Sequence, residues 1–405
     1  MIAVSDLEIR IGARVLMSDV NFRVSKGDKI GLVGRNGAGK TTLTKILAGD
    51  GQPDQGRVER AGEIGYLPQD PRSGDPEELA RHRILNARGL GELAAQMIKA
   101  SHDMSSVDEA IYDAAMKKYA KLEEKFQAAG GYAAEAQAET IAGNLGLKGS
   151  VLDQPLKTLS GGQRRRIELA RILFSNAETM ILDEPTNHLD ADSVVWLREF
   201  LKSYSGGLIV ISHDVDLIGE TVNRVFYLDA IRSVIDVYNM GWKHYLKQRE
   251  ADEERRKRER ANAEKKAGAL QLQAAKFGAK ASKAAAAQQM VRRAEKLLGS
   301  LDEVRESDKV ARIKFPDPAP CGKTPLMATH LSKSYGSQEI FTAVDLAIDK
   351  GSKVVVIGLN GAGKTTLLRM LAGIDKPDTG EIIPGHGLKV GYFAQEHETL
   401  DVNRT

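Results

Sequence analysis

The ten residues GRNGAGKTTL at Gly34–Leu43 return as GLNGAGKTTL at Gly358–Leu367, with nine identities at an offset of 324. The repeat extends beyond these residues: LAGDGQPDQG returns as LAGIDKPDTG at the same offset, and GYLPQD returns as GYFAQE two residues later. A single motif that arose twice by chance would not bring its flanks with it, so the pattern indicates two related modules. The chain is therefore expected to contain two copies of one fold, joined by a long connecting segment.

Each copy has the pattern GxxxxGKT between an apolar run of β-forming residues and a leucine-rich helical pattern. In such a loop glycines let backbone N–H groups approach phosphate oxygens, the lysine reaches the β- and γ-phosphates, and the threonine hydroxyl ligates Mg²⁺. A glycine turn without a ligand is the alternative, and the strand–turn–helix context argues against it. The predicted nucleotide-phosphate sites comprise Gly34, Asn36, Gly37, Ala38, Gly39, Lys40, Thr41 and Thr42, and Gly358, Asn360, Gly361, Ala362, Gly363, Lys364, Thr365 and Thr366.

Two further apolar runs of the first module end in polar residues. TMILDEP ends in Asp183 and Glu184, and LIVISHD places His213 after a second run. Ligands of open α/β sheets bind at the carboxyl ends of parallel strands. We therefore predict that Asp183 ligates Mg²⁺, that Glu184 orients or deprotonates the attacking water and that His213 senses the γ-phosphate. Taken singly, Asp183 as a helix cap and His213 as a surface histidine remain alternatives.

The stretch LSGGQRRRIELARIL places a hydroxyl and two glycines directly before an amphipathic helical pattern. This arrangement predicts a second anion-binding helix start, with Ser160 as N-cap and phosphate donor. In chain order the motifs resemble an ATP-binding-cassette ATPase over residues 1–230. The resemblance rests on Gly34–Thr41, Gln69, Leu159–Gln163, Ile181–Glu184, Leu189-Asp190 and His213.

The sequence DEPTNHLD at Asp183–Asp190 resembles the version found in ABC-F proteins, which carry two cassettes on one chain and act on the ribosome. The resemblance implies ATP and Mg²⁺ as cofactors, and cassettes that close head to tail. Each ATP then lies between the phosphate loop of one cassette and the signature of the other. It further implies a catalytic and metal-binding role for Gln69, and nucleotide contacts from Ser160, Gly161, Gly162, Gln163, Tyr335 and Gln395, with Thr365 and Gln395 as metal ligands of the second site. Tyr335 matches an aromatic that stacks on adenine in the family; Ile11 in the first module departs from that pattern.

Between the modules the composition changes to long charged and alanine-rich helical patterns. Residues 248–266 mix both signs of charge, whereas residues 271–297 contain six Lys or Arg and one Glu, a net charge of +5. We predict a helical hairpin that turns near 277–283 and contacts RNA, a solvated spacer being the alternative. In ABC-F proteins the corresponding hairpin reaches the tRNA region of the ribosome. The candidate RNA contacts are Lys276, Lys280, Lys283, Arg292 and Arg293.

Composition bears on the location of the protein, on disulfide bonds and on the extent of any basic surface. No apolar run approaches the roughly 20 residues that span a bilayer, and the start of the chain lacks a signal-peptide pattern, so a cytoplasmic protein is expected. Cys321 is the single cysteine, which excludes an internal disulfide. The net charge of +3 implies that any basic surface is local.

The expected fold class is α/β: two P-loop NTPase cassettes in tandem with a helical-hairpin linker. The expected domains are a first cassette at 1–241, the linker at 242–322 and the incomplete N-terminal part of a second cassette at 323–405. Residues 75–160 hold the helical subdomain, and whether they also form an arm is left open. We expect an ATPase that modulates translation or protects ribosomes from antibiotics. A transporter's nucleotide-binding subunit and a non-hydrolysing structural factor are the alternatives. Because the second module ends before a signature of its own, we also expect a fragment of a longer protein that hydrolyses ATP poorly as a monomer.

Overall fold

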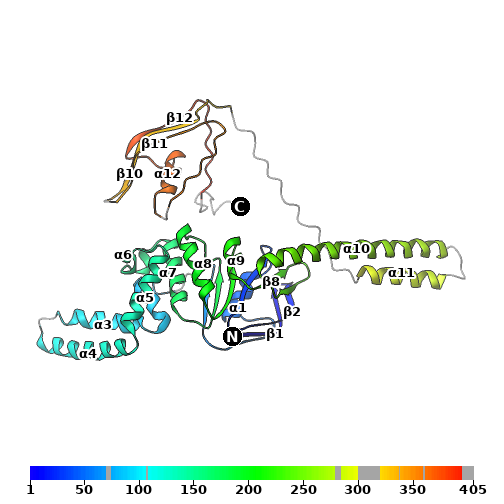
Figure 1. Cartoon of the computed structure of the whole chain (residues 1–405), viewed down its shortest axis with the longest axis horizontal. Coiled ribbons are helices and arrows are strands. Elements are labelled where there is room, and N and C mark those ends of the chain that lie inside the picture. The colour runs from blue at the N-terminus through cyan, green and yellow to red at the C-terminus, as the bar shows by residue number, and fades with distance from the viewer. Residues whose placement is uncertain are drawn as a thin grey trace. The chain divides into compact units, whose positions relative to one another are not determined.

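The computed structural model describes residues 1–69, 74–105, 108–278, 284–299, 320–336, 338–358 and 361–394. They form two compact units, Met1–Asp308 and Lys309–Thr405. The first unit contains a six-stranded sheet, a three-stranded sheet and helices on both faces (Figure 1). Among the helices formed by the described residues, none has the length and apolar character that a membrane span requires.

The large sheet has the strand order β5-β6-β7-β3-β8-β9. Its strands are β5 (Ile64–Leu67), β6 (Thr179–Asp183), β7 (Gly207–Ile211), β3 (Lys29–Gly34), β8 (Arg224–Asp229) and β9 (Val234–Tyr238). All neighbouring pairs are parallel except β8 and β9. β6 and β7 are buried along their whole length, which explains why their sequences are continuously apolar.

Alternate residues of these strands enter two separate cores. On one face, Ile181 and Ile209 pack with helix α1 (Lys40–Ala48) and the antiparallel sheet, whose order is β2-β1-β4. On the other face, Leu182 and Val210 belong to a second core, to which further helices contribute. The small sheet comprises β1 (Ile2–Ile11), β2 (Arg14–Val24) and β4 (Gln55–Arg60), and the covering helices are α7 (Gly161–Phe174), α8 (Ala191–Ser203) and α9 (Val215–Thr221).

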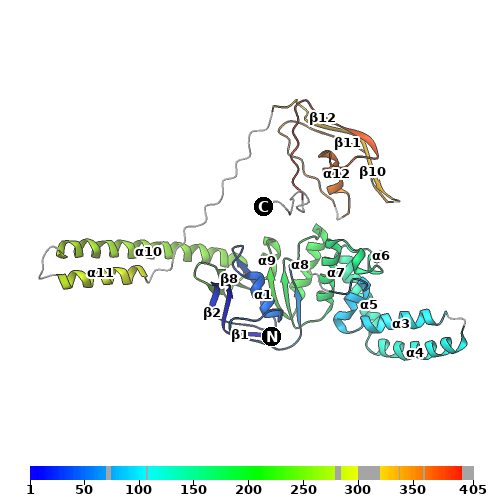
Figure 2. The ribbon, with the colours of Figure 1, turned by 180° about the vertical axis from the view of Figure 1, so that it is seen from behind.

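A helical subdomain lies between β5 and α7 in the sequence. α2 and α5 pack against α7, and α3 and α4 lie side by side as an antiparallel pair that extends from them (Figures 1 and 2). An extended helical pair is therefore present within residues 75–160. The helices and single turns are α2 (Ala80–Leu85), η1 (Asn86–Arg88), α3 (Gly91–Asp103), α4 (Glu109–Ala128), α5 (Gly131–Asn144), α6 (Gly149–Leu152) and η2 (Leu156–Thr158).

After β9 the chain forms the predicted helical hairpin, α10 (Trp242–Gly278) and α11 (Ala284–Gly299), which lie side by side (Figure 1). The 37 residues of α10 are mostly strong helix formers, and Arg–Glu pairs four residues apart add to its stability. At its root, Tyr245 is fully buried and the Arg249 guanidinium lies 4.2 Å from the centroid of the Tyr227 ring. The hairpin is thus anchored on β8 by aromatic packing.

The second unit repeats the antiparallel sheet of the first, with the order β11-β10-β12. The repeat reaches the backbone: Asp6 and Asp19 have positive φ angles, as do His330 and Ala343, 324 residues later. The elements are β10 (Leu326–Tyr335), β11 (Gln338–Ile348), α12 (Lys364–Leu371) and β12 (Thr379–Pro384).

One predicted strand is absent. Residues 353–358, the apolar run KVVVIG before the second loop, are not a strand, and Val355 and Ile357 are exposed. The corresponding strand β3 pairs with β7 and β8 on its two sides. Among the described residues of the second unit no segment takes the place of those neighbours, so the backbone of 353–358 has no strand to pair with.

Candidate nucleotide site

The first phosphate loop joins β3 to α1 and requires glycine at defined positions. Gly37 and Gly39 have φ angles of 75° and 94°, in the left-handed region that residues with a Cβ rarely adopt. A Cβ on Gly34 would lie 2.9 Å from the carbonyl oxygen of Leu228 on β8. The loop therefore holds its shape through glycine geometry and close packing against the neighbouring strand.

Lys40 and Thr41 begin α1 and connect the loop to the end of β6. The Lys40 ammonium donates to the carbonyl oxygens of Gly34 at 2.8 Å and Arg35 at 3.1 Å. The Thr41 hydroxyl donates to Asp183 Oδ2 at 2.9 Å. Burial lowers the pKa of Lys40, while the charges of Asp183 and Glu184 act in the opposite direction. The Lys40 ammonium, the Thr41 hydroxyl and the Asp183 carboxylate thus lie together at one edge of the loop.

Asp183 and Glu184 are buried at the carboxyl end of β6, as the sequence predicted from strand polarity. Burial raises the pKa of both carboxyls; the Thr41 hydrogen bond opposes this for Asp183, and the His213 N–H opposes it for Glu184. The His213 amide donates to Glu184 Oε2 at 3.3 Å, and His213 Nε2 lies 3.4 Å from Glu184 Oε1. The structure therefore brings the predicted base and the predicted phosphate sensor into contact.

The donor set suits Mg²⁺. Mg²⁺ prefers oxygen ligands and is held in proteins by one or two carboxylates together with nucleotide phosphates. Thr41 Oγ1 and Asp183 Oδ2 are two such oxygen atoms, and they lie 2.9 Å apart. Gln69 follows β5, the neighbour of β6, and its main chain is held by a hydrogen bond to Arg165. Its side chain is exposed, and the hydrogen bond with Arg165 is made by its main-chain carbonyl.

Ser160 is the N-cap of α7, as predicted. Its hydroxyl accepts from the Gln163 amide at 3.3 Å, and the Gln163 side chain accepts from the Ser160 amide at 2.9 Å, which completes a capping box. Gly161 and Gly162 form the first turn of the helix. These hydrogen bonds stay within the turn, so the structure groups the signature residues with α7 and not with the Lys40 loop.

The second loop repeats part of the first. Gly361 and Gly363 have positive φ angles of 83° and 85°, and the Lys364 ammonium donates to the Gly358 carbonyl at 2.7 Å. Tyr335 ends β10 as Ile11 ends β1, and both side chains are exposed. Thr365 and Thr366 lie on α12, and Ala362 lies in the turn before it. Asn360 and Gln395 lie outside the described residues.

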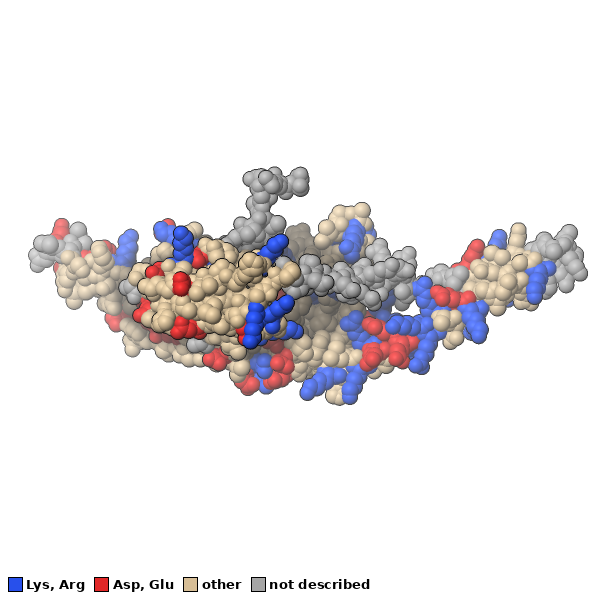
Figure 3. Space-filling model, turned by 90° about the horizontal axis from the view of Figure 1, so that it is seen from above, with Lys and Arg blue, Asp and Glu red and all other residues tan. Residues whose placement is uncertain are grey.

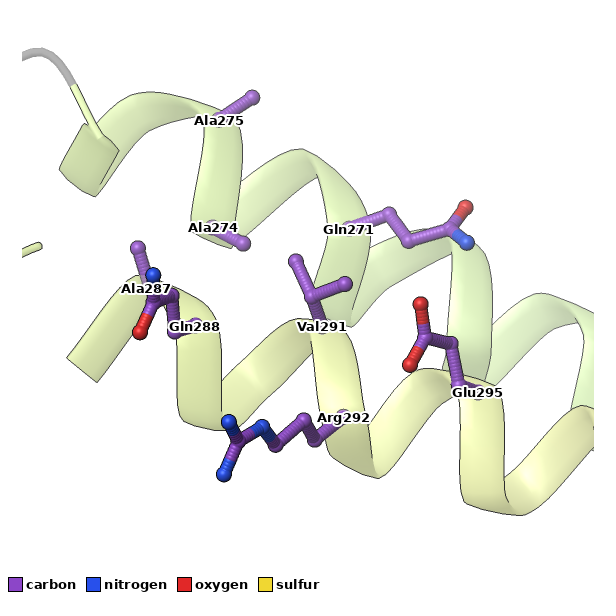
Figure 4. Close-up of a pocket in the computed structure, with 8 residues that line it drawn as sticks. All are labelled: Gln271, Ala274, Ala275, Ala287, Gln288, Val291, Arg292 and Glu295. Atoms are coloured by element: carbon purple, nitrogen blue, oxygen red, sulfur yellow. The ribbon is translucent and has the colours of Figure 1, made fainter. Parts of the chain in front are cut away.

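Some of the candidate RNA contacts lie within the described residues and some lie outside them. Lys276, Arg292 and Arg293 are exposed, whereas Lys280 and Lys283 lie outside the described residues. Figure 3 shows Lys and Arg mixed with Asp and Glu along the α10 side of the molecule. Small side chains, among them Ala274 and Ala287, line the groove between α10 and α11; Val291 points toward α10, while Arg292 extends along the outside of α11 (Figure 4).

Sequence reasoning missed Arg165. This residue is buried, and its guanidinium donates to the carbonyl oxygens of Asp183 at 2.8 Å and Glu184 at 2.9 Å, as well as to Gln69. A signal was present, because Arg165 precedes Leu169 and Ile172 at helical spacing, on the apolar face of α7. Arg165 was not singled out because it stands between two other arginines, Arg164 and Arg166.

Known protein families and curated proteins resemble this chain. Two family models described as ABC transporter match the chain, one over residues 17–187 and 341–403 and the other over 228–315. The chain is 32% identical over 397 residues to the "Probable ATP-binding protein YheS" of Escherichia coli K12, covering 98% of this chain and 60% of that protein. It is also 32% identical over 397 residues to the "Energy-dependent translational throttle protein EttA" of Haemophilus influenzae, covering 97% of this chain and 69% of that protein.

The chain therefore spans about 60% of the length of YheS and 69% of the length of EttA. The family match covers more than half of the chain and both phosphate loops. The repeated cassettes, the hairpin between them and these relatives show that the chain belongs to the ABC-F family of ATP-binding-cassette proteins.

Proposed function

We propose that the Lys40 site binds ATP with Mg²⁺ and hydrolyses it. The observation that carries this proposal is the convergence of Lys40, Thr41, Asp183, Glu184 and His213 at one edge of the sheet. In this proposal the loop amides and Lys40 hold the phosphates, while Thr41 and Asp183 hold the metal, which would neutralise charge on the γ-phosphate. Glu184 orients and deprotonates the attacking water, and His213 keeps that carboxylate in place.

We further propose that each nucleotide is enclosed by two cassettes. Ser160, Gly161, Gly162 and Gln163 begin a helix whose N-terminus favours anions, yet their hydrogen bonds stay within α7. A signature that does not serve the loop of its own cassette is free to contact a nucleotide held by another one. The domain boundaries at 241 and 322 belong to the same proposal, with the hairpin as the linker between the cassettes.

The proposed partner is the ribosome, through rRNA and tRNA, in the cytoplasm. The inner part of α10 neutralises much of its own charge through pairs such as Arg249–Glu253 and Arg260–Glu264. Among the described residues, Lys276, Arg292 and Arg293 at the outer part form no ion pair, so their charge is available for a phosphate backbone. The description of EttA as a translational throttle supports this choice. Tuning of translation and protection from an antibiotic are two forms of the proposed role.

The second candidate is a transporter's nucleotide-binding subunit, favoured by the description of the matching family models. Co-sedimentation separates the two: the purified chain is mixed with ribosomes or with membrane vesicles, with and without a non-hydrolysable ATP analogue. Nucleotide-dependent pelleting with ribosomes supports the proposal, and pelleting with vesicles alone overturns it. Toeprinting with and without ribosome-targeting drugs then distinguishes a translation factor from a protection factor.

A further inference from the structure

One buried arginine joins two strand ends. Arg165 is 6% exposed, and one guanidinium nitrogen donates to the Asp183 and Glu184 carbonyls at 2.8 and 2.9 Å. The other nitrogen donates to the Gln69 carbonyl and lies 3.4 Å from that of Pro68. A single planar group therefore holds the segment that follows β5 and the segment that ends β6.

This contact begins where the sheet hydrogen bonding stops. β5 and β6 pair in parallel as far as Leu67 and Leu182, and the residues beyond them no longer face each other in the ladder. Buried carbonyl groups need a donor, and a guanidinium offers five N–H groups in a fixed fork. Arg165 thus replaces the missing strand contact at the level of Gln69, Asp183 and Glu184.

The contact with Arg165 holds Glu184 in an unusual backbone conformation. Its φ angle is 51°, a conformation that residues with a Cβ avoid unless their surroundings impose it. The Glu184 amide donates to the Ile211 carbonyl at 2.8 Å, and the Glu184 carbonyl accepts from Arg165. The strained residue is fixed on both sides, which directs its carboxylate toward His213.

We propose that Arg165 is a positioning residue for ATP hydrolysis: it holds the main chain of Gln69, Asp183 and Glu184 and links these residues to the signature helix. The link follows from its place on α7, five residues after Ser160. A shift of the signature helix on nucleotide contact moves the guanidinium, and with it the metal ligand and the base. This inference rests on the proposed ATPase function.

Three variants of the whole chain test the proposal. Arg165→Met keeps the length and removes every donor, while Arg165→Lys keeps a cation that cannot span both strand ends. The control is Arg88→Met. Arg88 lies in η1, is partly buried and donates to the carbonyl of Phe174, at the other end of α7 from Ser160, at 2.7 Å. Thermal unfolding of each variant shows whether the fold persists.

The first measurement needs no nucleotide. Amide hydrogen exchange is followed in residues 181–187, which include the Glu184 amide bonded to Ile211. Arg165→Met should raise exchange in this segment by at least about tenfold, with a smaller rise in Arg165→Lys. Arg88→Met should leave the segment unchanged. Wild-type exchange rates in both Arg165 variants would overturn the proposal, and Arg165→Lys alone decides if Arg165→Met does not fold.

The second measurement is nucleotide affinity in a Lys364→Ala background, so that the Lys40 site dominates. A fluorescent ATP analogue is titrated with Mg²⁺ and with EDTA. Loss of an outer partner of a metal ligand weakens metal binding by roughly 10- to 100-fold, so Arg165→Met should weaken Mg²⁺-dependent affinity to this extent. Affinity in EDTA should change less than about twofold, because the loop amides and Lys40 remain in place.

The outcomes separate this inference from the function on which it rests. If the unsubstituted chain binds the nucleotide in neither condition, the proposed function falls and the inference falls with it. If that chain binds and Arg165→Met alters affinity equally with and without Mg²⁺, the ATP site stands and the positioning role is wrong.

Discussion

Burial raises the pKa of the Glu184 carboxyl, and the hydrogen bond from the His213 amide opposes this rise. The backbone of Glu184 has a φ angle of 51°. Both features concern placement, because a carboxylate that orients water must be held in one geometry at hydrogen-bond distance. The neighbouring Asp183 is held instead by Thr41. Two adjacent carboxylates therefore have different partners, which supports different roles for them.

Replacement of Glu184 by Gln keeps the size and removes the charge that polarises water. We expect ATP turnover to fall by at least about 100-fold while ATP binding is retained, since general base catalysis contributes about 10²–10⁴-fold. Steady-state phosphate release and nucleotide titration measure the two quantities. Glu178→Gln, an exposed carboxyl just before β6, is the control and should behave as wild type. Equal turnover in Glu184→Gln would exclude this residue as the base.

Sequence could place Lys40, Thr41, Asp183 and Glu184 together, because loops and strand ends of parallel sheets converge at one edge. It could not find Arg165, whose role depends on which side of α7 faces β5 and β6. A charged residue on the apolar face of a helix signals a buried contact, but the pattern does not name the partner. The carbonyl groups that it binds belong to segments about 100 and 20 residues away.

At the scale of elements, each small sheet has an irregular strand pair that only glycine allows. Gly56 has a φ angle of 87°, and an added Cβ would lie 2.3 Å from the Asp6 carbonyl oxygen; Gly380 meets the His330 carbonyl at the same 2.3 Å. The strand expected at 353–358 shows the opposite case. There the apolar pattern is present, but a strand also needs hydrogen-bonding neighbours, which no local pattern supplies.

Gly56→Ala should destabilise the first unit more than a left-handed conformation alone explains. A residue with a Cβ in that region costs about 1–2 kcal/mol, and the contact with Asp6 adds to it. Gly12→Ala is the control, because Gly12 has a φ angle of 59° with no atom near the added Cβ. Urea unfolding should show a free energy of unfolding lower in Gly56→Ala than in Gly12→Ala by at least about 1 kcal/mol. Equal values would show that the strand pair adapts.

The hairpin offers a second test at this scale. Lys276, Arg292 and Arg293 are changed to Gln, and ribosome association is measured against salt concentration. Each lost phosphate contact should reduce the slope of log affinity against log salt by about 0.7–0.9. The control changes Arg255, Arg258 and Arg260, which form ion pairs within α10, so that the net charge falls equally. If both variants lose affinity and slope to the same extent, net charge and not the outer part of the hairpin accounts for binding.

At the scale of the whole molecule, these 405 residues hold two phosphate loops and one LSGGQ signature. Residues 323–405 contain a phosphate loop but no counterpart of the Asp183-Glu184 pair. The Lys40 site has the carboxylates and His213, and in the arrangement that we propose its signature comes from another cassette. Internal repetition revealed the two modules; how cassettes pair depends on surfaces that no local sequence pattern describes.

Two chains that pair their first modules would complete two Lys40 sites, each with the Ser160 turn of the other chain. We therefore expect ATPase activity per chain to rise with protein concentration, because the active species is a pair. A dilution series of the intact 44.1 kDa chain measures this, with the oligomeric state followed by light scattering.

Mixing Glu184→Gln chains with Ser160→Arg chains adds a sharper test. Each parent alone has defective Lys40 sites, whereas a mixed pair contains one site with wild-type Glu184 and wild-type Ser160. Activity recovered on mixing would show that the signature acts across the pair, and fast hydrolysis independent of concentration would show that one chain suffices.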